Sequence, residues 1–244
     1  YYGRFILQEM EKFNINIQGI KVIKDIPTGV TVSLVNKEGE RALVSYPGSM
    51  GYFREEEIKE KWQLIEECEY VVFNGCFLMP GINFGRLLAQ IQNSGKTIIL
   101  DTGWDPSNWP EQHIEEMKGL LEYTDIFLPN LDEARVITGK KDPTEILNTL
   151  TKYGPSLAVV KMDRNGSIAL KEGKVYRQPS FKVKVTDTTG AGDTFNAGFL
   201  YGVMDGWDLN KTLQFATAFA SLYISSERKE YPRMEEIWQF MKSN

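Results

Sequence analysis

The chain has 244 residues, 42% of them hydrophobic, and a formal net charge of −5 at pH 7, which argues against a nucleic-acid surface built on clustered Lys and Arg. Two cysteines and one histidine offer neither a disulfide framework nor a zinc cluster, so carboxylates and lysines are the available catalytic groups. No apolar stretch approaches the roughly 20 residues that span a bilayer, and we expect a cytoplasmic protein with no membrane partner.

The beginning of the chain changes from helical to strand periodicity. Apolar residues at helical spacing predict a first helix over residues 2–13. The chain opens on Tyr1-Tyr2-Gly3 rather than on Met and enters this helical pattern at once, so we expect a piece of a longer polypeptide. Residues 30–34 and 42–46 alternate apolar and polar side chains around a turn at 36–39, which predicts a β-hairpin.

An apolar run precedes this hairpin at residues 20–23. Taken with the hairpin, it predicts a small strand layer over residues 19–47 with one apolar face. Two such layers could cover each other's apolar sides, so a homodimer through this layer is a further hypothesis.

From residue 54 onward, helical segments alternate with short apolar runs bounded by turn residues. The apolar runs, which we interpret as buried strands, are 70–73, 97–100, 125–128 and 157–160. This alternation predicts an α/β fold with a parallel sheet covered by helices on both faces, and a ligand crevice beyond the carboxyl ends of the strands. The loops expected at that edge are 74–75, 101–106, 129–130 and 161–163.

The last quarter of the chain, residues 191–244, is predicted to be mostly helical. A stripe of mostly small residues there could pack on a partner or a planar ligand, although a core-packing face is favoured. Its members are Leu213, Ala216, Ala220 and Tyr223. The only histidine, His113, lies in a polar run that predicts an exposed helix.

The most informative segment is the run Asp187-Thr-Thr-Gly-Ala-Gly-Asp193. Gly190 and Gly192 let the backbone turn its N–H groups one way, and a helix that begins near Ala191 adds uncapped N–H groups and the positive end of its dipole. Such a nest attracts phosphate oxygens, and Asp193 beside it could accept a proton from an attacking hydroxyl. The segment therefore predicts a phosphoryl-transfer site; an ordinary aspartate at a helix start is the less favoured alternative.

A second motif, Asn130-Leu-Asp-Glu133, follows the predicted strand 125–128 and begins a helix. It fits a capping box, in which Asn130 caps the helix and Glu133 bonds back to its start. It also fits a Mg²⁺ site beside a polyphosphate, because this hard cation prefers carboxylate oxygens. The glycine-rich segment at 187–193 favours the functional interpretation.

Three further residues lie at predicted strand ends. Lys161 could be a strand-edge cation or could steady a nucleotide phosphate, and neither interpretation is preferred. Asp101 and Asp105 lie near Trp104 and Trp109, where carboxylates and aromatic faces could receive a polyol or could build a rigid loop.

These motifs resemble the ribokinase or PfkB family of carbohydrate kinases. Residues 187–193 are similar to the carboxyl-terminal signature of that family, and Asn130-x-x-Glu133 is similar to its magnesium-associated motif. The hairpin, with Pro27-Thr-Gly29 and Gly39-Glu-Arg41, resembles the family's β lid, so the resemblance covers essentially the whole chain.

The resemblance implies a ribokinase-like three-layer α/β/α fold with a mostly parallel central sheet and a small β lid. Residues 1–18 and 48–244 would form the nucleotide- and substrate-binding core, and residues 19–47 would form the lid. The family's amino-terminal segment, with a sugar-binding Asp and a Gly-Gly motif, has no counterpart here, so much of the sugar site is expected to lie outside this chain.

The resemblance also implies roles for single residues. Asp193 would be the catalytic base and would also contact the substrate. Asp101 is a second candidate for contact with the substrate, because a carboxylate at that strand end could receive a polyol. The anion hole would be Gly190, Ala191 and Gly192. Asn130 and Glu133 would organise Mg²⁺, and the nucleotide would meet Asn130, Lys161, Thr188 and Thr217.

The chain departs from the family pattern at two places. Asp163 replaces the glycine of Lys161-x-Gly-x-x-Gly166, which predicts an altered nucleotide loop because Asp tolerates left-handed backbone less well than Gly. Residues 226–230 replace a glycine-containing segment that often helps to hold a monovalent cation, so a potassium requirement stays open.

The sequence therefore predicts an ATP-dependent, Mg²⁺-dependent kinase that phosphorylates a hydroxyl of a small sugar or sugar acid. An adenosine-like nucleoside kinase is one alternative. A non-catalytic ligand-binding relative is another.

Overall fold

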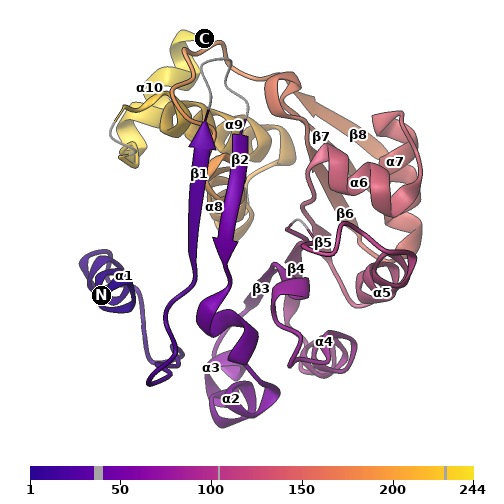
Figure 1. Ribbon diagram of the computed structural model, residues 1–244. Coiled ribbons are helices and arrows are strands. Elements are labelled where there is room, and N and C mark those ends of the chain that lie inside the picture. Colours follow the sequence, from indigo (N-terminus) through magenta and orange to yellow (C-terminus); the bar gives the residue numbers. More distant parts are fainter. Residues whose placement is uncertain (36–40, 104, 228–229) are drawn as a thin grey trace.

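Six strands form the central sheet, in the order β3-β4-β5-β6-β7-β8. The computed structural model describes residues 1–35, 41–103, 105–227 and 230–244 (Figure 1). Strands β3 to β6 are parallel, while β7 and β8 are antiparallel, so the predicted mostly parallel sheet is confirmed. The strands are β3 (Tyr70–Asn74), β4 (Thr97–Asp101), β5 (Ile126–Phe127), β6 (Leu157–Lys161), β7 (Ser167–Lys171) and β8 (Lys174–Gln178).

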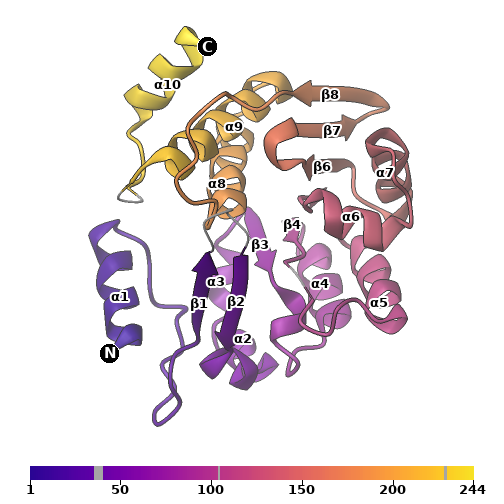
Figure 2. The ribbon, with the colours of Figure 1, turned by 45° about the horizontal axis from the view of Figure 1, so that its top comes forward.

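Helices cover both faces of this sheet (Figures 1 and 2). One face carries α4 (Phe84–Asn93), α5 (Glu111–Leu121), α6 (Leu131–Thr138) and α7 (Pro143–Leu150). The other carries α8 (Ala191–Met204) and α9 (Leu209–Ser225), with α10 (Met234–Ser243) packed on α9. Leu100 faces the first layer and Ile99 the second, and both are fully buried. A strand buried on both sides must be apolar throughout, which explains the continuous apolar runs and confirms the three-layer architecture.

Helices α8 and α9 approach each other closely. A Cβ atom on Gly198 of α8 would lie 3.0 Å from the Cα of Ala216 on α9. Leu213 and Ala216 are buried in the core between the sheet and these helices. The mostly small-residue stripe is therefore a core-packing face, as favoured from the sequence.

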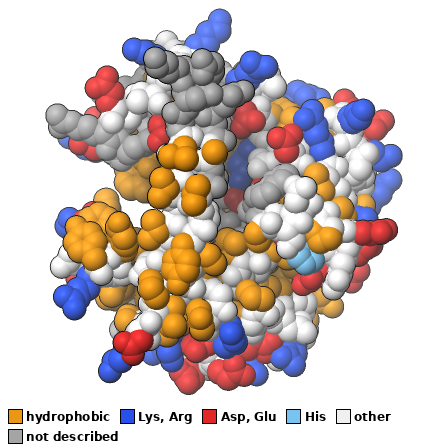
Figure 3. Space-filling view, viewed as in Figure 1, with side chains coloured by type: hydrophobic (Ala, Val, Ile, Leu, Met, Phe, Trp, Pro, Cys, Tyr) orange, Lys and Arg blue, Asp and Glu red, His pale blue; other side chains and the backbone are white. Residues whose placement is uncertain are grey.

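The hairpin stands beside this three-layer unit as a separate two-stranded sheet. Its strands are β1 (Val30–Val35) and β2 (Arg41–Tyr46), paired antiparallel with Val32 opposite Val44. The predicted hairpin is confirmed, and its turn at 36–39 lies outside the described residues. Val32 is 52% exposed and Val44 61% exposed, so the apolar face of the hairpin is open to solvent (Figure 3).

Two sequence predictions about the first 70 residues are wrong in part. Residues 20–23 form no strand, because the described chain gives their backbone no ladder partner. The helix expected after residue 54 is divided at Lys61 into α2 (Glu55–Glu60) and α3 (Trp62–Glu66). Helix α1 (Tyr2–Lys12) is present as predicted, but none of its described residues is buried. Among the described helices, none is long and apolar enough to cross a membrane.

Candidate active site

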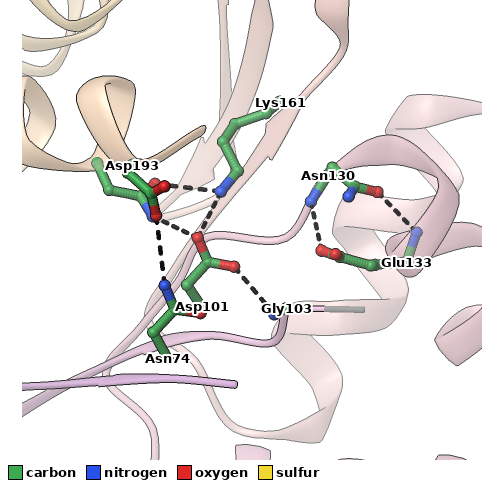
Figure 4. A network of polar contacts seen from close by, with 8 residues as sticks. Asn74, Asp101, Gly103, Asn130, Glu133, Lys161 and Asp193 are labelled. Atoms are coloured by element: carbon green, nitrogen blue, oxygen red, sulfur yellow. Dashed lines mark hydrogen bonds and ion pairs between the residues drawn. The ribbon is translucent and has the colours of Figure 1, made fainter. Parts of the chain in front are cut away.

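The carboxyl ends of the parallel strands bring polar residues from distant parts of the chain to one edge of the sheet (Figure 4). Asn74, Asp101 and Lys161 are the last residues of β3, β4 and β6. Asn130 follows β5 and forms an isolated parallel bridge with Lys161. The predicted convergence of the strand-end loops is confirmed. In the space-filling view, a hollow beside the hairpin contains side chains of both charges (Figure 3).

The start of α8 supplies unpaired amide groups. Gly190 is its N-cap residue, with a left-handed φ of 82° that glycine adopts without strain and with no side-chain cap. The Ala191 N–H donates to the Thr188 carbonyl at 3.1 Å. Within the described chain, the N–H groups of Gly192 and Asp193 have no acceptor. They belong to the positive end of a helix of 14 residues, which is suited to an anion.

Asp193 lies in the first turn of this helix, and its side chain is exposed. The Asn74 side-chain amide donates to Asp193 Oδ1 at 3.4 Å. Thr194, one residue further, donates its hydroxyl to the Gly190 carbonyl at 2.5 Å, which fastens the glycine turn to the helix. The Asp193 carboxylate is thus accessible at the same edge of the sheet as Glu133 (Figure 4).

A buried polar cluster lies between the sheet and α8. Lys161 Nζ donates to Asp101 Oδ2 at 2.7 Å and to Asn196 Oδ1 at 3.2 Å, and Asn196 Nδ2 donates to Asp101 Oδ2. Asp101 is 7% exposed and Asn196 8% exposed. The sequence analysis did not single out Asn196, because neither a motif nor a periodicity marks it.

Asn130 and Glu133 form the capping box that the sequence allowed. The Asn130 N–H donates to Glu133 Oε2, and the Glu133 N–H donates to Asn130 Oδ1, both at 2.9 Å. Glu133 is 3% exposed, and burial raises its pKa to about 7, partly offset by the hydrogen bond from the Asn130 N–H. A nearby cation would stabilise the charged form of this carboxyl and would lower its pKa.

The donor set for a metal is small. In the described residues, no group of three or more His, Cys, Asp and Glu side chains could hold a metal ion. Mg²⁺ commonly keeps several waters and takes one or two carboxylates plus phosphate oxygens, so Glu133 with Asn130 fits this ion when a polyphosphate is present. Thr102, next to Asp101, is buried, and its hydroxyl has no hydrogen-bond partner among the described residues. An unsatisfied buried hydroxyl here is consistent with a polar ligand.

Asp105 is a buried hydrogen-bond acceptor in the loop after β4. Asp105 is fully buried, and its carboxylate accepts hydrogen bonds from the N–H groups of Ser107 and Trp109. The ring of His113 lies 2.7 Å from the same carboxylate and stacks on Phe77 at 4.5 Å. Asp105 therefore organises this loop, which favours the loop-building interpretation over a polyol site. His113 lies in helix α5 as expected, but its side chain is only 27% exposed because Asp105 and Phe77 cover part of the ring. Trp104 lies outside the described residues.

A sequence model of the family described as "pfkB family carbohydrate kinase" matches residues 1–235 of the chain. The chain belongs to the PfkB family of carbohydrate kinases. Similar curated relatives are a 5-dehydro-2-deoxygluconokinase of Clostridium perfringens and a 2-dehydro-3-deoxygluconokinase of Bacillus subtilis. They are 25% and 26% identical, over 99% of this chain and 75% and 78% of their own lengths.

The fold of this carbohydrate kinase is also found in solved structures. An E. coli protein described as a "putative Ribokinase II", solved in complex with ATP and Mg²⁺, matches with a TM-score of 0.89 at 19% identity. The match covers 99% of this chain and 80% of the other. The ribokinase-like fold expected from the sequence is thus confirmed.

The remaining predicted site residues of the PfkB kinase lie in different settings. Thr188 is exposed in the loop before α8. Thr217 is buried in α9 and donates its hydroxyl to the Leu213 carbonyl at 2.8 Å; within the described chain, no hydrogen bond joins it to the other candidates. Asp163 adopts the left-handed φ of 48°, so it takes up a backbone conformation that favours glycine.

Proposed function

We propose that this carbohydrate kinase transfers the γ-phosphoryl group of ATP to a hydroxyl of a small sugar or sugar acid, with Asp193 as the base. The observation that carries the proposal is the first turn of α8, where an exposed carboxylate lies beside two amide groups that have no acceptor among the described residues. Phosphoryl transfer needs a proton acceptor for the attacking hydroxyl and donors for the charge on the transferred oxygens.

In the proposed mechanism, Asp193 accepts the proton of the sugar hydroxyl while the Asn74 amide holds its carboxylate. The anion hole of Gly190, Ala191 and Gly192 receives the phosphoryl oxygens. The Gly192 amide is accessible at once, whereas the Ala191 amide must leave the Thr188 carbonyl. Asp101 and Asp193 would be the side chains of this chain closest to the sugar.

ATP and Mg²⁺ are the proposed co-substrate and cofactor. Support comes from the E. coli structural neighbour, which was solved with both. Asn130 and Glu133 would hold the metal ion, which when bound neutralises charge on the phosphates. Lys161, Thr188 and Thr217 would meet the nucleotide. Residues 19–47 would act as a lid over a core of residues 1–18 and 48–244.

Sugar acids are the favoured substrates within this proposal. The two curated relatives are named for dehydro-deoxy derivatives of gluconate, which are sugar acids. An assay that measures ADP release tests this preference, with ketodeoxygluconate, ribose, fructose and adenosine supplied in turn as the phosphoryl acceptor. Turnover of adenosine alone would support a nucleoside kinase instead. ATP–Mg²⁺ binding with no turnover on any of the four would support a non-catalytic relative.

The direct test of the mechanism is Asp193→Asn in the full protein. Removal of a general base is expected to reduce kcat by about 10²–10⁴-fold. Asp205→Asn is the matched control, since Asp205 lies just past the other end of the same helix and accepts only from Trp207 in the described structure. Near wild-type turnover of Asp193→Asn would refute the assignment.

The hairpin is also proposed to form a homodimer. Val32 and Val44 are direct cross-strand partners and more than half exposed, so a second copy could cover them. Val32→Glu places a charge on this apolar face and should prevent dimerisation. Light scattering at micromolar concentration should then give the molar mass of a monomer. Thr31→Glu, on the opposite face of the same strand, should not. A monomeric wild-type protein under these conditions would dismiss the dimer.

A further inference from the structure

Asp101, Lys161 and Asn196 form a closed triangle of hydrogen bonds whose three corners come from β4, β6 and α8. Every pair of corners is joined directly. The Lys161 side chain is 13% exposed and that of Asp101 9% exposed, so the ion pair is largely removed from water. Removal of either partner of a buried ion pair leaves the other charge uncompensated and destabilises the protein.

The triangle lies directly beneath the proposed anion hole. Lys161 Nζ is 3.7 Å from the point that a Cβ atom on Gly192 would occupy. Asn196 follows Asp193 by three residues in α8 and therefore lies on the same side of the helix. An ammonium has three N–H donors, of which the described residues engage two, so one is available to a ligand.

We propose that Asp101 and Asn196 are positioning residues, which hold the first turn of α8 in fixed register with the Lys161 ammonium on the sheet. Asp101 balances the charge of Lys161 and sets its position. Asn196 carries that position to α8 by donating to Asp101 and accepting from Lys161. This inference rests on the proposed function, because it concerns the placement of Asp193 and the adjacent amides relative to a transferring phosphoryl group.

The physical reason for such a device is the steep dependence of catalysis on geometry. A displacement of about 1 Å at the reacting groups costs on the order of 10²-fold in rate. Among the described residues, the start of α8 has no side-chain cap. Its polar attachments to the sheet are the 3.4 Å bond from Asn74 to Asp193 and, one turn further along, the hydrogen bonds of Asn196. Loss of that attachment should affect the chemical step more than substrate binding.

The test uses Asn196→Leu and Asp101→Asn, both close to isosteric, singly and together in the full protein. We expect Asn196→Leu to reduce kcat 10- to 100-fold while the KM for ATP changes less than threefold. Asn148→Leu, the same substitution at an exposed position of α7, is the control. If the triangle acts as a unit, the double variant should lose little more kcat than the worse single variant.

The outcomes separate this inference from the proposed function. If Asn196→Leu folds and keeps kcat within twofold of wild type while Asp193→Asn is inactive, the positioning role is refuted and the proposed function stands. Multiplicative losses in the double variant would also refute it. If Asn196→Leu does not fold, Asn196→Ala, which removes the same two hydrogen bonds with a smaller side chain, decides by the same comparison of the loss in kcat with the change in KM for ATP. If Asp193→Asn retains activity, the proposed function itself fails.

Discussion

Glu133 provides a prediction about stability that needs no substrate. Its carboxyl is buried, and its pKa is raised from the ordinary 4.5 to about 7, mainly because burial disfavours the charged form. Below pH 4.5 the carboxyl is neutral in the folded and the unfolded chain. As the pH rises from 4.5 to 7, the unfolded chain releases this proton while the folded chain keeps it, so the folded state loses stability.

One pKa unit corresponds to about 1.36 kcal/mol, so the rise from 4.5 to about 7 corresponds to a loss of about 3 kcal/mol above pH 7. Glu133→Gln removes the charge but can still accept the Asn130 N–H through its amide oxygen, which preserves the helix cap. Without divalent ions, we expect the variant and wild type to differ little at pH 4.5. The variant should be more stable by about 2–3 kcal/mol at pH 8.

Urea unfolding between pH 4.5 and pH 8 measures this difference. Glu145→Gln is the matched control, since Glu145 also lies in the first turn of a helix but is exposed. Its curve should run parallel to that of wild type. If the Glu133→Gln curve also runs parallel to that of wild type, burial does not disfavour the Glu133 carboxylate and the reasoning is refuted. Added Mg²⁺ with ATP should stabilise wild type at pH 8 more than Glu133→Gln.

Three further predictions concern the scaffold. Asp163→Gly should raise the free energy of unfolding by about 1 kcal/mol in thermal or urea unfolding, because glycine adopts the left-handed φ of 48° without strain; a loss of stability would contradict this. Asp105→Ala should lower it by about 2–4 kcal/mol, since two backbone N–H groups and His113 lose a buried acceptor, and an unchanged Tm would refute the anchoring role. Gly198→Ala should lower the free energy of unfolding by about 1–3 kcal/mol, because its Cβ would lie 3.0 Å from the Cα of Ala216 on α9. The control Gly119→Ala, which has open space in α5, should be neutral or stabilising. Equal effects of the two substitutions would contradict the close packing of α8 on α9.

The parts of the fold that local signals specify were predictable. Runs buried on both sheet faces are apolar throughout, so β3, β4 and β6 were found, and the alternation with helices gave the layers. Strands β7 and β8 were missed, although Glu172 and Gly173 between them, both with positive φ, are a turn signal of a hairpin. The expected strand at 20–23 had the right residues, but a strand also needs a neighbour, which local composition cannot specify.

The candidate site divides in the same way. Asp193, with its glycines, and the Asn130–Glu133 box are local patterns whose chemistry can be recognised in a few residues. The triangle beneath them joins positions 60 and 95 residues apart, so no window of sequence contains it. Asp101 was noticed for its loop and Lys161 for its strand end, but their pairing is a property of the sheet order.

The glycine turn that opens α8 has a consequence for how the enzyme could fail or be regulated. In the proposed mechanism, the proton acceptor and the donors to the phosphoryl oxygens share one helical turn, so a tilt of α8 would carry both away from the nucleotide together. If that mechanism holds, a ligand or substitution that moves α8 would abolish both functions at once, and no intermediate form would deprotonate the sugar without stabilising the transferred group.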